Sequence, residues 1–532
     1  MRSGVGTDPH ISTPVTRKND MEISTKVPRY NSTGESASGE FRGAHVPSQQ
    51  QSWQAGKTSQ FAVDDAASVP DVLAPLTAEQ QNAADCLVRC CKIASRQGKS
   101  RPQLWNFGFQ AGAGCGKNYT AAHPTGLLAQ LRGAGFSVGI AAPTHIACSV
   151  SREYLQKSGI QIETRTLHSI LGMKPVKDGA QQRFLPIGES SLDLFDVLLI
   201  DEASMVSPQL FWEAQKQRQH QVFIWMGDPS QLPPVSEDSS DFEISPALDE
   251  QNLLDVYQLE ETHRFGGPLL EKATLLRTEP GEWRARWKAQ GDSIRTVPDE
   301  FDLRDAFGKQ LKAGDGSVRM MAYTNRRVDY WNRIAHARLF GGKADPYLAG
   351  MTLLSRQSIT PNAVHKDDRK YIQGEPLQLW GSSYEIDILE DVEQTKISLD
   401  EQPSEWAPFD AWLIKAHSPF TRQEHWVQVL HESEKGRFQG YLKDIANYAK
   451  RSKGEKRQEL WSLFWTWKES FADVQPAYAS TVHRAQGQGI DHVFLDLLDL
   501  KRTGQKSPEL AQALIYTAAT RARKSITALG EE

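Results

Sequence analysis

The chain has 532 residues and a mass of 59.5 kDa, which corresponds to about three or four domains. Hydrophobic residues make up 39% and charged residues 24%, and 61 Lys and Arg stand against 66 Asp and Glu, for a net charge of −5. This balance excludes a uniformly basic nucleic-acid binder but permits a local basic groove. Since no stretch approaches the roughly 18 apolar residues of a membrane-spanning helix, we expect a soluble protein without a membrane partner.

The cysteines are too few for a disulfide scaffold in a chain of this length, and they lack the paired spacing of a zinc site. They are Cys86, Cys90, Cys91, Cys115 and Cys148. We expect reduced thiols in a cytosolic protein.

Residues 1–70 are rich in Ser, Thr, Gly, Gln and Pro and show no apolar periodicity. Such a composition cannot bury enough surface to offset the entropy of ordering, so it predicts a disordered tail. The tail lacks the apolar segment of a signal peptide, and its acidic residues argue against a transit peptide. A partner-binding or targeting arm is the alternative.

From Leu76 onward, apolar segments of strand length alternate with helical stretches, which is typical of a parallel-sheet α/β fold. The predicted buried strands are Leu104–Phe109, Val138–Ala142, Val197–Ile200, Val222–Met226, Val318–Ala322 and Val493–Leu497.

The stretch from about 346 to 435 has a different pattern. Apolar residues alternate at Tyr384, Ile386 and Ile388 and again over residues 426–430, which predicts an inserted antiparallel or barrel-like β region. A helical region follows at about 436–472. It carries aromatic residues at helical spacing, namely Trp461, Phe464, Trp465 and Phe471, together with Lys468. We interpret them as a core stripe, with base stacking as the alternative.

A glycine-rich turn follows the first predicted strand. The chain reads Ala-Gly-Ala-Gly-Cys-Gly-Lys-Asn over residues 111–118, directly before a helical segment. Backbone N–H groups of such a loop can surround phosphate oxygens, and the helix N-terminus adds its dipole. We predict a nucleotide-binding P-loop made by Gly112, Ala113, Gly114, Cys115, Gly116, Lys117 and Asn118, with Lys117 reaching the β- and γ-phosphates. An ordinary βα turn is the alternative.

Two carboxylates and a glutamine follow later strands of the same sheet. Asp201 and Glu202 come directly after Val197–Ile200, and Gln231 lies on the loop after Val222–Met226. A Mg²⁺ ion needs a carboxylate near the phosphates, and hydrolysis needs a group that orients water. We assign Asp201 to the metal, Glu202 to the base and Gln231 to sensing the γ-phosphate.

Further segments resemble, in order, the motifs of superfamily 1 helicases, and most of all the Dda- and RecD-like branch called superfamily 1B. The matching strings are LTAEQ at 76–80, AAPTH at 141–145, TLHS at 166–169, LEETHR at 259–264, MAYTN at 321–325, STVHRAQG at 480–487 and YTAATR at 516–521. They span nearly the whole chain except the tail.

The resemblance implies two RecA-like domains that close on ATP and step along single-stranded DNA. It assigns Gln80 to adenine, Arg264 to the γ-phosphate and Arg521 to an arginine finger from the second domain. For Gln80 the alternative is a helix-capping box with Thr77. The resemblance also places a set of residues on the DNA, namely Pro143, Thr144, His145, Thr166, His168, Asn325, Thr481 and His483.

The segment at about 173–187 contains Asp178-Gly179, a hairpin turn signal. In the family branch that the chain resembles, a hairpin here separates the strands as a pin, with an aromatic residue at the fork. By position that residue is Phe184, which we add to the DNA-binding set. A plain surface hairpin is the alternative.

The P-loop departs from the family pattern in several places. Asn118 stands where the motif has a Ser or Thr that ligates Mg²⁺, and Ala111 replaces the first glycine. Pro124 and Gly126 lie in the helix that should follow, at a cost of about 3 and 1 kcal/mol. They predict a kink, or a helix that restarts near Thr125. We still expect an active ATPase, because the groups that serve a γ-phosphate and its metal are retained.

The expected fold is α/β, with two RecA-like parallel-sheet P-loop domains, an inserted SH3-like β domain and a disordered N-terminal tail. The expected units are a tail at 1–70, domain 1A at 71–265 with the pin hairpin, domain 2A at 266–345 and 476–532, and the inserted domain 2B with its helices at 346–475.

The function that the resemblance implies is an ATP-dependent DNA helicase with 5′-to-3′ polarity and ATP and Mg²⁺ as cofactors. Its expected partners are single-stranded or forked DNA, with single-strand-binding or replication proteins as further candidates. A monomer in the cytoplasm of a bacterial or phage-infected cell is expected. The alternatives are a nucleic-acid-binding protein with impaired ATPase and an RNA helicase of the same superfamily.

Overall fold

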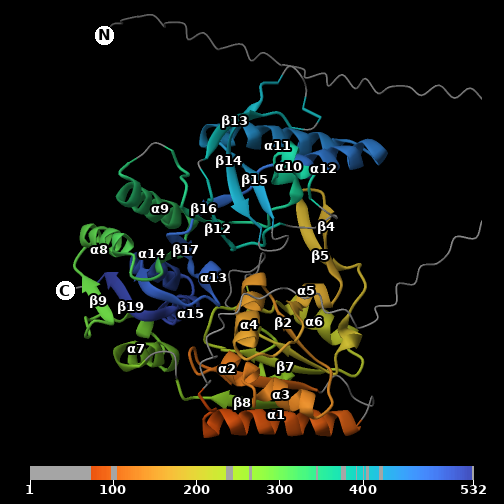
Figure 1. Ribbon diagram of the computed structural model, residues 1–532, viewed down its shortest axis with the longest axis vertical. Coiled ribbons are helices and arrows are strands. Elements are labelled where there is room, and N and C mark those ends of the chain that lie inside the picture. Colours follow the sequence, from red (N-terminus) through yellow and green to blue (C-terminus); the bar gives the residue numbers. More distant parts are fainter. Residues whose placement is uncertain are drawn as a thin grey trace, which may run out of the picture. The chain divides into compact units, whose positions relative to one another are not determined.

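The computed structural model (Figure 1) describes residues 74–97, 105–234, 244–262, 266–342, 345–372, 379–390, 392–399, 401–402, 406–418 and 423–529. The predicted tail at 1–70 lies outside the described residues.

The first sheet has six parallel strands in the order β3-β2-β6-β7-β1-β8. The strands are β1 (Asn106–Ala111), β2 (Val138–Ala142), β3 (Thr164–Thr166), β6 (Val197–Ile200), β7 (Val222–Gly227) and β8 (Asp255–Leu259). In β6, Val197 and Leu199 enter one core cluster, and Leu198 and Ile200 enter another. This alternation in an all-apolar strand is what a sheet covered on both faces requires.

Helices cover both faces of this sheet. They are α1 (Ala78–Gln97), α2 (Lys117–Ala122), α3 (Leu127–Gly133), α4 (His145–Lys157), α5 (Leu167–Ile170) and α6 (Pro208–Gln217). Apolar residues of α1, α2 and α3 join the core cluster on one face, and those of α5 and α6 join the cluster on the other. The layering confirms the parallel α/β prediction for this part of the chain.

The helix after the P-loop is interrupted, as Pro124 and Gly126 predicted. Helix α2 ends at Ala122, and α3 begins at Leu127. Gly126 is required at the break, because a Cβ built on it would lie 2.0 Å from the carbonyl oxygen of Thr120. The restart thus comes two residues later than expected.

The second sheet has five parallel strands in the order β17-β10-β18-β19-β9. The strands are β9 (Ile294–Val297), β10 (Val318–Ala322), β17 (Ala479–Thr481), β18 (Ile490–Leu495) and β19 (Ala522–Leu529). β18 lies earlier than the predicted Val493–Leu497, because Asp496 accepts a hydrogen bond from the backbone of Asp499 and caps the next helix.

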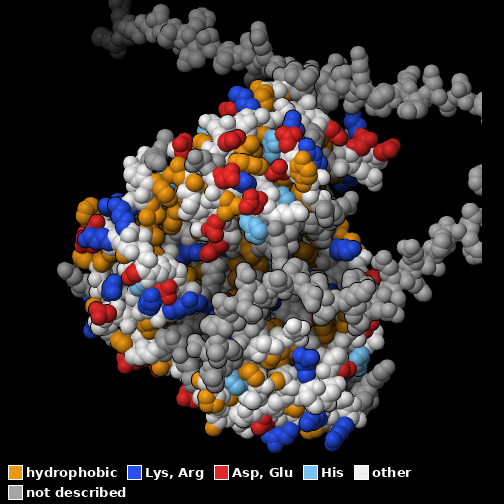
Figure 2. Space-filling model, in the orientation of Figure 1, with side chains coloured by type: hydrophobic (Ala, Val, Ile, Leu, Met, Phe, Trp, Pro, Cys, Tyr) orange, Lys and Arg blue, Asp and Glu red, His pale blue; other side chains and the backbone are white. Residues whose placement is uncertain are grey.

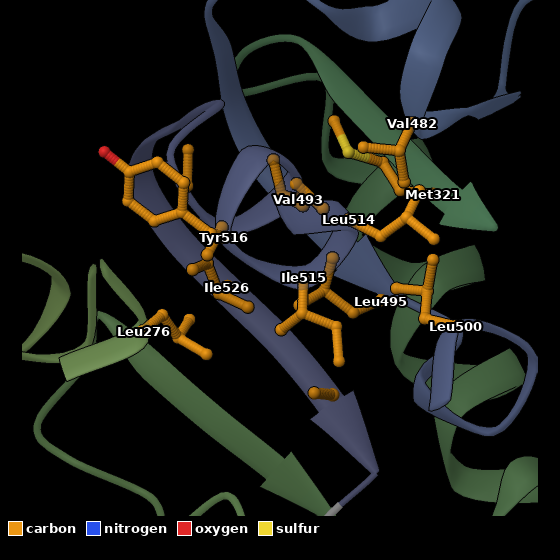
Figure 3. Packing of buried hydrophobic residues seen from close by; sticks show 14 of the residues in the cluster. Leu276, Met321, Val482, Val493, Leu495, Leu500, Leu514, Ile515, Tyr516 and Ile526 are labelled. Atoms are coloured by element: carbon orange, nitrogen blue, oxygen red, sulfur yellow. The ribbon is translucent and has the colours of Figure 1, made fainter. Parts of the chain in front are cut away.

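The helices of the second sheet are α7 (Gly267–Thr278), α8 (Glu300–Ala313), α9 (Asn325–Phe340), α13 (Val482–Ala485), α14 (Leu497–Arg502) and α15 (Pro508–Ala519). Figure 3 shows how Leu514 and Ile515 of α15 pack against Val493, Leu495 and Ile526 of the sheet. Its C-terminal half, from Ala513 to Ala519, is buried throughout, so the helix fixes the position of any group at its C-terminal end.

Between α9 and β17 the chain forms the inserted β region. Two antiparallel three-stranded sheets have the orders β12-β11-β16 and β13-β14-β15. The strands are β11 (Thr352–Ser355), β12 (Glu385–Asp387), β13 (Glu393–Ile397), β14 (Phe409–His417), β15 (Glu424–Leu430) and β16 (Val474–Pro476), and the helices are α10 (Lys366–Arg369), α11 (Lys435–Arg451) and α12 (Gly454–Lys468).

The aromatic stripe of α12 is core. Phe464 and Trp465 are buried with Phe471 in a cluster that also takes Phe409 of β14, and Trp461 packs against it. This confirms the packing interpretation over base stacking. A separate two-stranded sheet, β4 (Met173–Asp178) with β5 (Gln181–Pro186), is the predicted hairpin.

Acidic and basic side chains are interspersed over the described part of the face shown in Figure 2, in keeping with the nearly balanced totals. Among the described residues, no helix has the length and apolar character needed to cross a membrane. The five cysteines are free thiols.

Candidate nucleotide site and nucleic-acid face

The P-loop connects β1 to α2 through residues 112–116. Gly114 and Gly116 have φ values of 87° and 84°, a left-handed backbone that glycine adopts without strain. The carbonyl of Gly116 accepts a 2.7 Å hydrogen bond from the N–H of Thr120, which begins the helix. The loop therefore holds the strand–turn–helix geometry that a phosphate cradle needs.

One cavity gathers most of the predicted nucleotide residues. It is lined by the P-loop residues Gly112, Ala113, Gly114, Gly116, Lys117 and Asn118, by Asp201, Glu202 and Gln231, and by Gly487 and Arg521 of the second sheet. Cys115 and Gln80 are not in the lining. The cavity thus combines groups from both sheets, as the motif order predicted.

Asp201 and Glu202 follow the end of β6. Asp201 is fully buried, and its two oxygens accept hydrogen bonds from the Ser151 hydroxyl at 3.0 Å and the Glu202 N–H at 2.8 Å. Burial, and then the neighbouring carboxylate of Glu202, raise the pKa of Asp201, while Lys117 opposes the rise. Glu202 itself has a left-handed backbone at φ 51°, a strained conformation that non-glycine residues keep mainly at functional sites.

Asn118 supplies an oxygen with no partner among the described residues. Its Oδ1 is buried and makes no hydrogen bond there, although Asn118 lines the same cavity as Asp201 and Lys117. A buried, unpartnered amide oxygen beside a buried carboxylate fits a hard divalent cation, which prefers oxygen ligands.

Gln80 closes the start of α1. Its Oε1 accepts from the N–H of Thr77 at 3.2 Å, and the Thr77 hydroxyl accepts from the N–H of Gln80 at 3.3 Å, which is a reciprocal capping box. Its Nε2 also donates to the carbonyl of Cys115 at 3.4 Å. The capping alternative is therefore correct for this side chain. The hydrogen bond to Cys115 connects α1 to the P-loop. The adenine contact stays a prediction.

Arg521 follows α15 and is buried. Its Nε donates to the carbonyl of Thr517 at 3.1 Å, and an Nη donates to the Thr520 hydroxyl at 3.3 Å. These contacts hold the guanidinium at the cavity. Arg264, the other predicted γ-phosphate arginine, lies outside the described residues.

Three residues that the sequence motifs left without a role cross between the sheets. Tyr516 reaches Asp228 and the P-loop, Gln486 reaches Ser204, and Arg277 of α7 lies beside Gly112. Tyr516 and Gln486 lie within the motifs at 516–521 and 480–487, so their positions could be predicted, but no sequence signal predicts the length or direction of these contacts.

The predicted nucleic-acid residues occupy the ends of strands and the starts of helices. The hydroxyls of Thr144 and Thr166 accept from Ala147 N–H and Ser169 N–H, and so cap α4 and α5. Pro143, His145 and His168 are partly buried in the same region. On the second sheet, Asn325 is exposed at the start of α9, and Thr481 and His483 flank the start of α13.

The histidines of this face favour the neutral form. Burial lowers the pKa of His168 to about 4, with a smaller contribution from His145, and burial lowers the pKa of His483 to about 4 as well. Near pH 7 these rings are therefore hydrogen-bonding groups without a net charge.

The hairpin places Phe184 away from its turn. Phe184 pairs with Pro175 in the middle of the ladder and is 40% exposed, and its ring centroid lies 4.7 Å from that of His168. The turn itself lies at α12, where Trp465 Nε1 donates to the carbonyl of Gly179 at 2.8 Å. The hairpin thus joins the first sheet to the inserted region.

Charged side chains strengthen the contact between the hairpin and the α12 region. Lys177 of the hairpin forms a 2.7 Å ion pair with Glu469, and its Nζ lies 5.2 Å from the ring centroid of Trp465. Trp465 of the aromatic stripe therefore contacts the hairpin turn in addition to packing in the core.

Three family models match the chain. An AAA domain matches residues 105–237, a Dda helicase SH3 domain matches 384–476, and a UvrD-like helicase C-terminal domain matches 476–527. They correspond to the first sheet, the inserted β region and the end of the second sheet.

Curated relatives extend over most of the chain. The ATP-dependent DNA helicase dda of Enterobacteria phage T4 is 27% identical over 415 residues, covering 74% of this chain and 87% of the relative. The RecBCD enzyme subunit RecD of Mycobacterium tuberculosis is 25% identical over 488 residues, covering 88% of this chain and 72% of the relative. Among solved structures, the Pif1 helicase from Candida albicans has a TM-score of 0.36 at 14% identity, covering 86% of this chain and 95% of that one.

The ordered motifs, the two parallel sheets that share one P-loop cavity, and the matched domains agree with one another. The matched domains and the curated relatives are all those of a superfamily 1B helicase of the Dda- and RecD-like branch, the family that this chain resembles over most of its length.

Proposed function

We propose that this chain is an ATP-dependent DNA helicase that translocates 5′ to 3′ on single-stranded DNA and unwinds duplex ahead of it. The observation that carries the proposal is the single cavity in which the P-loop, Asp201, Glu202 and Gln231 of the first sheet meet Arg521 from the second. A site shared by two sheets responds to the presence of a γ-phosphate by closing, which is how such motors turn hydrolysis into movement.

Lys117 and the loop N–H groups bind the phosphates, and Arg521 adds a positive charge from the second sheet. Asp201 and Asn118 would hold a divalent cation such as Mg²⁺, which when bound neutralises charge on the phosphate oxygens. Gln231 and Glu202 orient the attacking water.

In the hydrolytic step, the water oxygen forms a bond to the γ-phosphorus while the bond from that phosphorus to the β–γ bridging oxygen breaks. The electron pair leaves with ADP, and Glu202 accepts the proton from the water. Opening and closing of the cleft shifts the grip on DNA between the segments at 143–145 and 166–168 and those at 325 and 481–483. The hairpin β4–β5 separates the strands at the fork.

The test is ATP hydrolysis by the purified full-length protein, with and without single-stranded DNA, over a Mg²⁺ titration. Strong stimulation by DNA supports the proposal. DNA binding without hydrolysis would favour the alternative with an impaired ATPase, and greater stimulation by RNA of equal length would favour the RNA helicase.

The direction of translocation requires a separate experiment with tailed duplexes. Duplexes with a single 5′ tail or a single 3′ tail, otherwise of identical sequence, are compared for unwinding at saturating ATP. The proposal expects unwinding of the 5′-tailed duplex, and preference for the 3′-tailed one would reverse the assigned direction.

A further inference from the structure

Gln486 lies at the point where a proposed DNA-binding segment meets the hydrolytic site. The segment begins with β17, which ends at Thr481 of the proposed DNA face, continues through His483 in helix α13, and reaches Gln486, the C-cap residue of that helix. The side chain of Gln486 is 5% exposed. It therefore lies in the protein interior, three residues after a residue assigned to DNA and directly before Gly487, which lines the cavity.

The side-chain amide of Gln486 contacts three groups of the first sheet. Its Nε2 lies 3.1 Å from Ser204 Oγ, 3.5 Å from Glu202 Oε2 and 3.5 Å from Gln231 Oε1. Because a carboxylate only accepts hydrogen bonds, the atom that faces Glu202 is the amide nitrogen, which sets the orientation of the amide. One donor group from the second sheet thus contacts both the proposed base, Glu202, and the proposed γ-phosphate sensor, Gln231.

The amide oxygen of Gln486 accepts no hydrogen bond from the described residues. Gln486 Oε1 is buried and has no hydrogen-bond partner among the described residues. Buried acceptors are normally paired with protein or water, so this oxygen is suited to accept from a water held beside Glu202. The next residue leaves room for it: Gly487 lines the cavity, and a Cβ built there would lie 3.9 Å from Glu202 Oε1.

We infer that Gln486 is a positioning residue that orients Glu202, Gln231 and the attacking water, and that ties this arrangement to the DNA-contacting segment at 481–483. The inference rests on the proposed function, since it concerns how DNA stimulates hydrolysis. DNA bound at 481–483 fixes α13, and α13 carries the amide that the hydrolytic groups need.

The test uses Gln486→Met in the full-length protein, which keeps the length of the side chain and removes its hydrogen bonds. We expect the DNA-stimulated kcat to fall about 10- to 100-fold, less than the roughly 100- to 1,000-fold loss for a donor that itself contacts the reacting atoms. The KM for ATP, the affinity for a fluorescent single strand and the melting temperature should stay close to those of the wild type. The DNA-free kcat should fall less, so the stimulation ratio should collapse.

Gln488→Met is the matched control, because Gln488 lies on the same segment and contacts Ala485 through its backbone. Ser204→Ala probes the same contact from the first sheet and should lower the stimulation ratio in the same direction, by a smaller factor. Gln486→Glu places a second carboxylate beside Glu202 and should be the most damaging of the variants.

A wild-type protein without DNA-stimulated hydrolysis overturns the proposed function and this inference with it. If the wild type is stimulated and Gln486→Met keeps its stimulation ratio, the inference alone is wrong. Equal losses of DNA affinity, melting temperature and activity would assign Gln486 a purely structural role, which also overturns it.

Discussion

The hydroxyl of Tyr516 donates a 2.6 Å hydrogen bond to the carboxylate of Asp228, and so joins α15 to the loop after β7. The same oxygen accepts from the N–H of Ala113 in the P-loop at 3.2 Å. In Figure 3 the ring of Tyr516 lies against the apolar cluster and its hydroxyl points away from it. Burial, and then Asp228, raise the pKa of Tyr516 well above its usual range, so it stays a donor at any working pH.

Tyr516→Phe should therefore weaken closure of the cleft while the apolar packing survives. Leaving a buried carboxylate and a loop N–H short of a partner costs about 1–3 kcal/mol, so we expect the kcat at saturating DNA to fall about 10-fold or more. Steady-state hydrolysis is the measurement. Tyr478→Phe, which also removes a hydroxyl from a partly buried ring, is the control and should keep its activity.

Asn118→Thr should raise ATP turnover at limiting Mg²⁺, because a hydroxyl is the shorter ligand that the motif uses at this position. We expect a several-fold gain at low Mg²⁺ that shrinks at saturation. The measurement is kcat across a Mg²⁺ titration for the wild type, Asn118→Thr and Asn118→Ala. An unchanged turnover and an unchanged Mg²⁺ dependence would show that Asn118 does not limit the metal site.

Gly126→Ala should be strongly destabilising. The new Cβ would lie 2.0 Å from the Thr120 carbonyl oxygen, so the backbone between α2 and α3 has to move, at a cost of about 3 kcal/mol or more. Gly133→Ala is the control, because a Cβ there meets no atom within 4 Å and adds helix propensity. Urea unfolding of both variants checks the contrast, and equal midpoints would contradict the geometry of the break.

Trp465→Phe should impair unwinding more than hydrolysis. It removes the donor to the carbonyl of Gly179 and loosens the hairpin turn, but it leaves the nucleotide cavity untouched. We expect the unwinding rate to fall about 3- to 10-fold at an ATPase rate close to wild type, from the loss of about 1 kcal/mol. Trp461→Phe is the matched control, because Trp461 Nε1 has no hydrogen-bond partner among the described residues. This variant should retain both the unwinding rate and the ATPase rate.

His483 should make the protein sensitive to acid. Its pKa falls from 6.5 to about 4 on folding, so above pH 6.5 the ring is neutral in both states and contributes nothing. As the pH falls toward 4, the unfolded state binds the proton more tightly, which costs the folded state about 2 kcal/mol at pH 5. Unfolding at pH 8 and pH 5 should show a smaller acid loss for His483→Gln than for the wild type or for the exposed control His417→Gln.

The sequence was sufficient where one local rule decides the outcome. Val197–Ile200 is apolar throughout, and only a strand covered on both faces accepts that. Pro124 and Gly126 broke the P-loop helix as their backbone chemistry requires. The aromatic spacing of α12 predicted a packed face, and the packed face is there.

The remainder depends on contacts between distant segments. Gln80 could be assigned to capping or to adenine, and its hydrogen bonds with Thr77 became visible only in three dimensions. Phe184 was assigned to the fork from its position in the chain, and that role stays a prediction; its pairing with Pro175 in the middle of the ladder could not be predicted from the sequence. The contact of Trp465 with Gly179 joins residues 286 positions apart, which no local pattern encodes.

The break after Ala122 leaves the P-loop helix only six residues long. A helix of that length is marginal by itself, since isolated helices need roughly 12–15 residues to persist in water. Its amides should therefore exchange with solvent through local opening, well below the free energy of global unfolding. A phosphate bound at its N-terminus opposes that opening, so occupancy of the loop and protection of residues 117–122 from hydrogen exchange are two measures of one equilibrium.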